Sequence, residues 1–226
     1  TSHYSQVAKQ VDGATYVKIK NLDIPWVFPA QVPKRIYPNG ALAGNLLGFV
    51  GTEGQPLEGL EVSENKCLAG VDGKETYQRG VDGIKIPGSA DYKVAPKNGG
   101  TLKLTIDSDL QYYAQQVMAK FVRNERADWG SAIVVEAKTG KILAAAEAPS
   151  VDPNNYSAVD AGNRSSRIFR VTFEPGSTVK MVTAATAIDQ GVATPTTHVV
   201  APQTSYVANN FRISDSHVHP VEKLTL

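Results

Sequence analysis

The stretch Glu174–Lys180 holds the residues whose types and spacing are best suited to chemistry. Ser177 and Lys180 are three positions apart, and an apolar run without proline follows them as far as Gly191. Because positions i and i+3 share one face of a helix, the Lys180 ammonium group can reach the Ser177 hydroxyl. A serine becomes an effective nucleophile when a base takes its proton, and a helix N-terminus stabilises developing negative charge. The spacing therefore predicts acyl transfer, with Ser177 as nucleophile and Lys180 as base.

A second Ser-x-x-Lys match, from Ser63 to Lys66, shows that spacing alone is weak evidence. Charged residues surround this match, and turn-rich sequence containing Gly70 and Gly73 follows it where an apolar helix follows Ser177. We therefore interpret Ser63 as incidental and Ser177 as the candidate nucleophile.

The composition is that of a soluble globular protein, with 226 residues, 42% of them apolar and 20% charged. The net charge of +1 provides no field to attract nucleic acid, so we expect no nucleic-acid partner. Arg164, Arg167 and Arg170 form a short basic cluster that we interpret as a solvated loop or cleft edge. The single cysteine, Cys67, excludes an internal disulfide, and we expect it to be a buried small residue.

Two histidines, His217 and His219, follow Asp215 and have the look of metal ligands on one face of a strand. No second ligand cluster accompanies them, so we predict neither a metal nor a cofactor. No apolar run is long enough to span a bilayer. The chain begins at Thr1 rather than at a methionine, which suggests a piece of a longer protein.

Hydrophobic periodicity predicts an α+β chain in two parts, with a loop-rich boundary around residues 87–100. The first part is expected to be irregular and rich in short strands. The second part is expected to contain a capped helix, a hairpin covered on both faces, a long irregular segment and a helix buried on most sides. In chain order, the predicted elements are strands at 15–20 and 45–51, a helical segment from Gly59, a strand at 101–106, a helix from Asp107 or Ser108 to Arg123, strands at 130–136 and 141–146, the irregular segment 149–170, and a helix from Ser177 to Gly191.

Six stretches, in this order along nearly the whole chain, resemble the class B penicillin-binding proteins, the serine D,D-transpeptidases of bacterial division and elongation. They are Arg35–Pro38, Leu47–Gly51, Gly59–Glu61, Leu104–Asp107 with Leu110-Gln111, Gly130–Ala146 and Glu174–Lys180. The resemblance implies a β-rich, irregular pedestal (dimerisation) module at residues 1–98. It further implies that residues 99–226 form the N-terminal part of a transpeptidase domain related to serine β-lactamases.

The same resemblance implies a mechanism and a location. Ser177 would attack the penultimate D-alanine of a peptidoglycan stem peptide, Lys180 would act as its base, and the Ser177 N–H would form half of an oxyanion hole. β-Lactam antibiotics would trap the acyl-enzyme, and membrane proteins of the divisome or elongasome would be partners. The parent protein would lie on the extracytoplasmic side of the bacterial membrane, anchored by an N-terminal transmembrane helix that this chain lacks.

The chain departs from the family pattern downstream of Ser177. Family members carry a Ser-x-Asn motif and a Lys-Thr-Gly or Lys-Ser-Gly motif after the nucleophile, and neither follows Ser177 here. We therefore expect this chain alone to be inactive, with a second chain completing the transpeptidase domain or with the partial domain disordered, swapped or rearranged. Two alternatives stay open: a non-catalytic scaffold whose residues 1–98 recruit partners, and a serine β-lactamase or β-lactam sensor.

Overall fold

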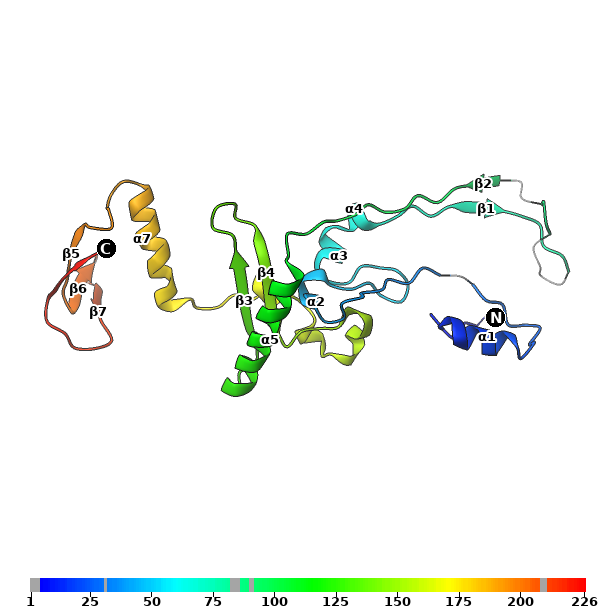
Figure 1. Ribbon diagram of the computed structural model, residues 1–226, viewed down its shortest axis with the longest axis horizontal. Coiled ribbons are helices and arrows are strands. Elements are labelled where there is room, and N and C mark those ends of the chain that lie inside the picture. The colour runs from blue at the N-terminus through cyan, green and yellow to red at the C-terminus, as the bar shows by residue number, and fades with distance from the viewer. Residues whose placement is uncertain (1–4, 31, 82–85, 90–91, 208–210) are drawn as a thin grey trace. The chain divides into compact units, whose positions relative to one another are not determined.

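The computed structural model describes residues 5–30, 32–81, 86–89, 92–207 and 211–226. The chain divides into two compact units, Thr1–Val171 and Thr172–Leu226. Each unit contains helices and strands (Figure 1), which confirms the predicted α+β class. The division at residue 98, which separates a pedestal module from a transpeptidase part, stays a prediction.

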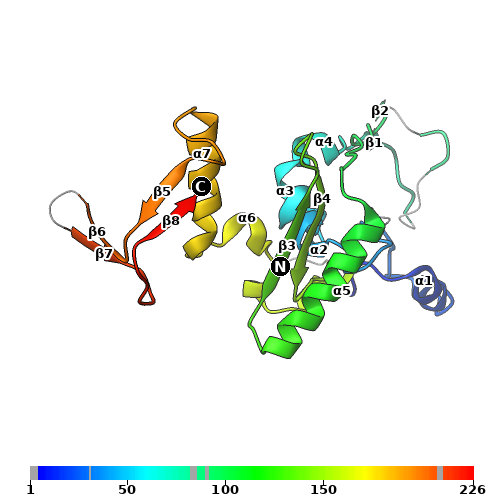
Figure 2. The ribbon, with the colours of Figure 1, turned by 60° about the vertical axis from the view of Figure 1, so that its left-hand side comes forward.

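A helix packed on a β-hairpin forms the centre of the first unit (Figure 2). The helix is α5 (Ser108–Glu125), and the antiparallel hairpin consists of β3 (Gly130–Val135) and β4 (Ile142–Ala148). The Asp107 carboxylate caps α5 by accepting the N–H groups of residues 109 and 110 at 3.0 and 2.9 Å. The predicted helix and hairpin are therefore confirmed.

The two strands of the hairpin differ in how far they are covered. From Ala144 to Ala148 every residue of β4 is buried, and small side chains there let α5 approach closely. Along β3, half-buried and exposed residues alternate, and Ile133 and Val135 are 48% and 50% exposed. Coverage on both faces was thus correctly predicted for β4 and wrongly predicted for β3.

The strand predicted at residues 101–106 is not formed. Those residues belong to no helix or strand, and Thr105 and the following Asp107 each make one hydrogen bond to β4. The Thr105 hydroxyl donates to the Ile142 carbonyl at 2.6 Å, and the Asp107 N–H donates to the Leu143 carbonyl at 2.9 Å. A side chain supplies one of these bonds, so no backbone ladder develops.

Of two strands predicted near the N-terminus, the first is helical throughout and the second begins as a helix. α1 (Gly13–Lys20) occupies the first, where the Asp12 carboxylate accepts the Thr15 N–H at 2.7 Å. This N-cap favours a helix over the strand that the alternation of six residues predicted. α1 buries no residue, so no packed apolar face is present to favour a strand. α2 (Gly44–Leu47) covers the first three residues of the second, 45–51, where Val50 forms an isolated bridge with Pro56. The helical segment predicted from Gly59 is confirmed by α3 (Gly59–Ser63), which α4 (Asn65–Leu68) follows.

The end of α2 and the start of α3 cross with their backbones in contact. A Cβ on Gly48 would lie 1.8 Å from the Glu58 carbonyl oxygen, and one on Gly59 would lie 2.5 Å from the Gly48 nitrogen. Both glycines also have positive φ angles, of +75° and +61°. Only glycine satisfies both conditions at this crossing.

Side-chain amides fasten the N-terminal segments to the residues around α5 and β4. Each amide oxygen accepts a backbone N–H, and each amide nitrogen donates to a backbone carbonyl, as a neighbouring strand would. The pairs are Asn154 with Tyr37 (3.0 and 2.8 Å), Gln115 with Ala43 and Ala41 (3.2 and 2.9 Å), and Asn45 with Val151 and Asn163 (3.1 Å each). Residues on both sides of position 98 therefore belong to one folded unit.

After α4, residues 71–76 and 92–97 lie side by side as a narrow two-stranded arm (Figure 1). β1 (Lys74–Thr76) pairs antiparallel with β2 (Tyr92–Val94), and an isolated bridge joins Val71 to Lys97. Cys67, on α4 at the base of this arm, is exposed, so its predicted burial is wrong. α4 buries none of its residues, and no core forms around the thiol.

The segment predicted to be irregular, residues 149–170, consists of turns and three short helices. They are η1 (Pro153–Ala158), η2 (Ala161–Asn163) and α6 (Arg167–Arg170). The Tyr156 ring stacks on Phe49 at a centroid distance of 4.2 Å and a 7° interplanar angle. This contact adds an aromatic link to the N-terminal segments.

The second unit begins with a 3₁₀ turn, η3 (Gly176–Thr178), which leads into α7 (Val179–Asp189). Two strand pairs follow (Figure 2): β5 (His198–Ala201) with β8 (Glu222–Thr225), and β6 (Thr204–Val207) with β7 (Phe211–Ser214). The extent of α7 agrees with the prediction, since Gly191 follows it with φ +68°. Its predicted burial is wrong, because α7 buries no residue. Among the described helices, none is long and apolar enough to cross a membrane.

Candidate active site

Ser177 and Lys180 lie within one helical turn, as their spacing predicted. Ser177 is the middle residue of η3, and Lys180 is the second residue of α7. Gly176 supplies a left-handed turn with φ +56° just before the serine. Both side chains are exposed, and across the described ranges no hydrogen bond joins them. The backbone thus brings the two residues together without fixing the contact between their side chains.

The backbone N–H groups at the start of α7 have no side-chain cap. Neither Pro175, which precedes η3, nor Thr178, which precedes α7, accepts a first-turn N–H through its side chain. The first N–H groups of a helix point away from its body and carry partial positive charge. The Thr178 and Val179 N–H groups already donate to carbonyls of the 3₁₀ turn, those of Pro175 and Gly176. The Ser177 N–H is therefore the donor at this helix start that is suited to stabilising an oxyanion.

The second Ser-x-x-Lys match lies in the opposite helical environment. Ser63 is the last residue of α3, and Lys66 lies in the short helix α4 that follows. A helix C-terminus carries partial negative charge, which disfavours an alkoxide or oxyanion there. The interpretation of Ser63 as incidental agrees with this placement.

Two triplets upstream of Ser177 match the Lys-Thr-Gly and Ser-x-Asn motifs that family members carry after the nucleophile. Lys138-Thr139-Gly140 lies in the turn between β3 and β4, where the Gly140 N–H donates to the Glu136 carbonyl at 2.8 Å. Thr139 donates to the Glu136 carboxylate, and Gly140 has φ +71°. Ser63-Glu64-Asn65 lies across the junction of α3 and α4. Sequence reasoning passed over both triplets. The contacts of the first explain it as a turn, and the second belongs to the ends of two short helices.

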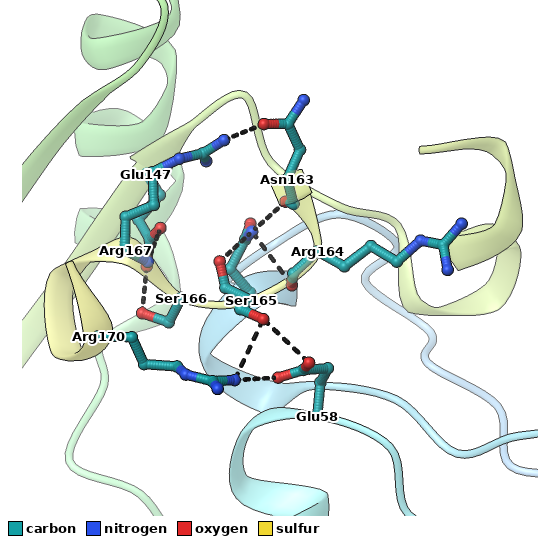
Figure 3. A network of polar contacts seen from close by, with 9 residues as sticks. Glu58, Glu147, Asn163, Arg164, Ser165, Ser166, Arg167 and Arg170 are labelled. Carbon is teal, nitrogen blue, oxygen red and sulfur yellow. Dashed lines mark hydrogen bonds and ion pairs between the residues drawn. The ribbon is translucent and has the colours of Figure 1, made fainter. Parts of the chain in front are cut away.

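A buried carboxylate anchors the chain ahead of Ser177 (Figure 3). Glu147, near the end of β4, accepts the Ser166 hydroxyl and the Arg167 N–H, the latter at 2.8 Å. Arg167 is buried, donates to the Asn163 side chain and lies over the Trp129 ring at 6.0 Å. The prediction that the basic cluster is solvated is therefore wrong for Arg167.

A second group of contacts joins the same segment to the start of α3 (Figure 3). The Glu58 carboxylate accepts the Ser165 hydroxyl at 2.9 Å and pairs with the Arg170 guanidinium at 3.0 Å. Arg170 also donates to the Ser165 hydroxyl at 3.2 Å. Residues 163–170 are thus held on one side by β4 and on the other by the N-terminal segments. Sequence reasoning missed Glu58 and Glu147, since neither belongs to a recognisable motif.

Comparison with known proteins identifies the family. Residues 130–224, which include the β3–β4 hairpin and the Ser177 turn, match the family model described as the penicillin-binding protein transpeptidase domain. The chain is 39% identical over 194 residues to penicillin-binding protein PbpB of Mycolicibacterium smegmatis, covering 84% of this chain and 29% of that protein. The chain belongs to the class B penicillin-binding proteins.

Two further relatives agree with this family. Peptidoglycan D,D-transpeptidase FtsI of Buchnera aphidicola is 33% identical over 220 residues, covering 97% of this chain and 38% of FtsI. A solved structure of penicillin-binding protein 3 from Mycobacterium tuberculosis, in complex with aztreonam, has a TM-score of 0.67 at 30% identity. The match covers 85% of this chain and 39% of that one. The chain therefore spans between a quarter and two fifths of each of these three proteins.

Proposed function

We propose that the protein containing this chain is a peptidoglycan D,D-transpeptidase that acylates Ser177. The observation that carries the proposal is the pair Ser177 and Lys180, one helical turn apart at an uncapped helix start, inside the segment that matches the transpeptidase family. The names of the relatives support the reaction class. The aztreonam and ampicillin complexes of a relative support β-lactams as ligands.

In the proposed reaction, Ser177 Oγ attacks the carbonyl carbon of the penultimate D-alanine of a stem peptide. Lys180 Nζ, as a neutral amine, takes the hydroxyl proton and returns one to the departing D-alanine nitrogen as the C–N bond breaks. The Ser177 N–H donates to the oxyanion that forms in between. The amine of a second stem peptide then displaces Ser177 from the ester and forms the cross-link.

The exposed face of α7 supports a wider part of the proposal. Met181, Val182 and Ile188 are 70%, 64% and 43% exposed, and apolar residues at such spacing normally pack against a partner. We infer that further polypeptide covers α7 in the active protein. The pedestal module at residues 1–98, partners in the divisome or elongasome and an extracytoplasmic, membrane-anchored location belong to the same proposal.

The experiment is intact-mass measurement after incubation with benzylpenicillin. It compares the full-length parent protein with its Ser177→Ala and Ser63→Ala variants. We expect one covalent adduct on the parent and on Ser63→Ala, and none on Ser177→Ala. An adduct that survives Ser177→Ala would overturn the assignment of the nucleophile. A parent that forms no adduct and releases no D-alanine from a pentapeptide substrate would favour the scaffold alternative.

A Lys180→Gln variant tests the role of the base separately. Removing the amine should slow acylation by about 100-fold or more, within the range typical of general-base catalysis. The Ser177 hydroxyl stays in place, so a slow adduct should still form. Acylation at the parental rate would exclude Lys180 as the base while leaving Ser177 as the nucleophile.

A further inference from the structure

The connection from β7 to β8 contains an aspartate–histidine pair that the acyl-transfer proposal does not use. His219 Nε2 lies 2.8 Å from Asp215 Oδ2, and its Nδ1 lies 2.7 Å from the backbone oxygen of Pro220. The prediction that His217 and His219 lie on a strand is wrong, since both belong to this connection. Pro220 has no N–H for a ladder, which is a physical reason for the interruption. The ring centroids of His217 and His219 are 5.4 Å apart.

Both ring nitrogens of His219 face groups that only accept hydrogen bonds. A backbone carbonyl has no proton to donate, and neither does an ionised carboxylate. A neutral imidazole carries one N–H and can satisfy one of these contacts, whereas an imidazolium satisfies both. The shared proton belongs on His219, because a carboxylic acid is the stronger acid by about 2–3 pKa units. Both contacts are therefore satisfied together when His219 is protonated.

The surroundings of His219 favour the same charge state. Its side chain is only 8% exposed, while that of Asp215 is 53% exposed. The hydrogen bond to Asp215, followed by that to the Pro220 carbonyl, raises the pKa of His219 above its ordinary value of 6.5 against the opposing effect of burial. Glu222, on β8, acts in the same direction. His217 is the neighbouring titratable ring.

We propose that Asp215, His219 and the Pro220 carbonyl form a pH-sensitive clasp that holds the β7–β8 connection while His219 is protonated and releases it as the pH rises. The Asp215 N–H donates to the Gln203 carbonyl at 2.9 Å, next to the start of β6. Through this hydrogen bond of Asp215, the clasp is also connected to the base of the β6–β7 hairpin. This device is independent of the acylation of Ser177.

The direction of the pH effect follows from linkage. A group whose folded-state pKa is raised stabilises the fold fully below its unfolded pKa, here about 6.5. That contribution is lost as the pH rises through the higher, folded-state pKa of His219. The connection should thus be held in mildly acidic solution and loosened in mildly alkaline solution.

The test follows the histidine ring signals of the 226-residue chain by NMR across this pH range. The His219 signals are identified as those that the His219→Asn variant lacks. We expect His219 to titrate above 6.5, with both ring nitrogens protonated at acid pH. Amide exchange of residues 215–219 and of Val221, corrected for its intrinsic pH dependence, should accelerate several-fold over the same titration. A midpoint at or below 6.5, or exchange that ignores the titration, would overturn the proposal.

Two variants identify the groups that act. Asp215→Asn keeps the size of the side chain and removes its charge, so the midpoint should fall towards the ordinary histidine value and the change in exchange should disappear. His217→Asn should keep both the midpoint and the change. Loss of the transition in His217→Asn alone would assign it to the other ring and contradict the clasp. If Asp215→Asn unfolds the strands, the His219 midpoint and the amide exchange of the unaltered chain still test the proposal.

Discussion

The side-chain amide of Gln111 makes a hydrogen bond to each backbone group of Ala145. Its Oε1 accepts the Ala145 N–H at 2.7 Å, and its Nε2 donates to the Ala145 carbonyl at 3.0 Å. Gln111 is fully buried. A side chain of α5 thus bonds to β4 as a third strand of the sheet would, and it joins the helix to the hairpin at the centre of the first unit.

Replacing Gln111 with glutamate should lower the free energy of unfolding by about 2–3 kcal/mol at neutral pH. A carboxylate still accepts the Ala145 N–H, but it cannot donate to the Ala145 carbonyl, and it adds a buried charge. Urea unfolding should show a lower midpoint with an unchanged slope. The loss should shrink in acid, where the neutral carboxyl group can donate.

Gln116→Glu is the matched control, because it makes the same substitution on an exposed face of the same helix. We expect a change within about 0.5 kcal/mol. Equal losses in the two variants would attribute the effect to added charge on α5 and would contradict the role of the Ala145 hydrogen bonds.

The sequence alone predicts the elements whose signal is long and local. α5 has an N-cap and five turns of periodic residues, and the β3–β4 hairpin has two apolar runs around a glycine turn. Ser177 and Lys180 are found together because their relationship is contained in four consecutive residues. Short alternations such as residues 15–20 carry too little information, and there the Asp12 cap decides the outcome.

What the sequence does not predict depends on contacts between distant residues. Glu147 is buried through bonds to residues 19 and 20 positions away, and Asn45 through bonds to residues more than 100 positions away. Nothing in the neighbourhood of either residue distinguishes it from a surface polar side chain. The burial expected for α7 failed for a related reason, since an apolar helix indicates a need for cover without showing what supplies it.

Gly48→Ala should destabilise the chain more than Gly54→Ala does. Both glycines have positive φ, of +75° and +83°, so both substitutions introduce backbone strain of about 1–2 kcal/mol. A Cβ on Gly48 would also meet the Glu58 carbonyl at 1.8 Å, whereas one on Gly54 meets no atom within 4 Å. Thermal or urea unfolding of the two variants compares them directly. Equal losses would show that the α2–α3 crossing adjusts without cost.

Tyr37 should make the stability of the fold fall in strongly alkaline solution. Burial, followed by the hydrogen bond to Glu61 at 3.0 Å, raises the pKa of Tyr37 well above its ordinary value of 10.0. The unfolded chain therefore loses this proton first, so the contribution of Tyr37 is complete below pH 10 and is lost above it. The difference in unfolding free energy between the unaltered chain and Tyr37→Phe should shrink over that range.

Tyr112→Phe is the control for Tyr37→Phe, since the Tyr112 side chain lies on α5 and is 60% exposed. The change in the Tyr37→Phe difference over this pH range should exceed the change in the Tyr112→Phe difference. A Tyr37→Phe difference that changes no more than the Tyr112→Phe difference would mean that the fold does not oppose ionisation of the Tyr37 phenol.

Glu147→Ala should both destabilise the first unit and release the segment that leads to Ser177. The substitution leaves the Ser166 hydroxyl and the Arg167 N–H without their buried acceptor, which should cost about 2–4 kcal/mol. Hydrogen exchange of the Arg167 amide should accelerate more than that of α5, because the bond to Glu147 is local to this segment. Glu125→Ala, at an exposed position in the last turn of α5, should leave the stability of the first unit and the exchange rate of the Arg167 amide nearly unchanged. Uniform acceleration across the unit would show that Glu147 contributes only to global stability.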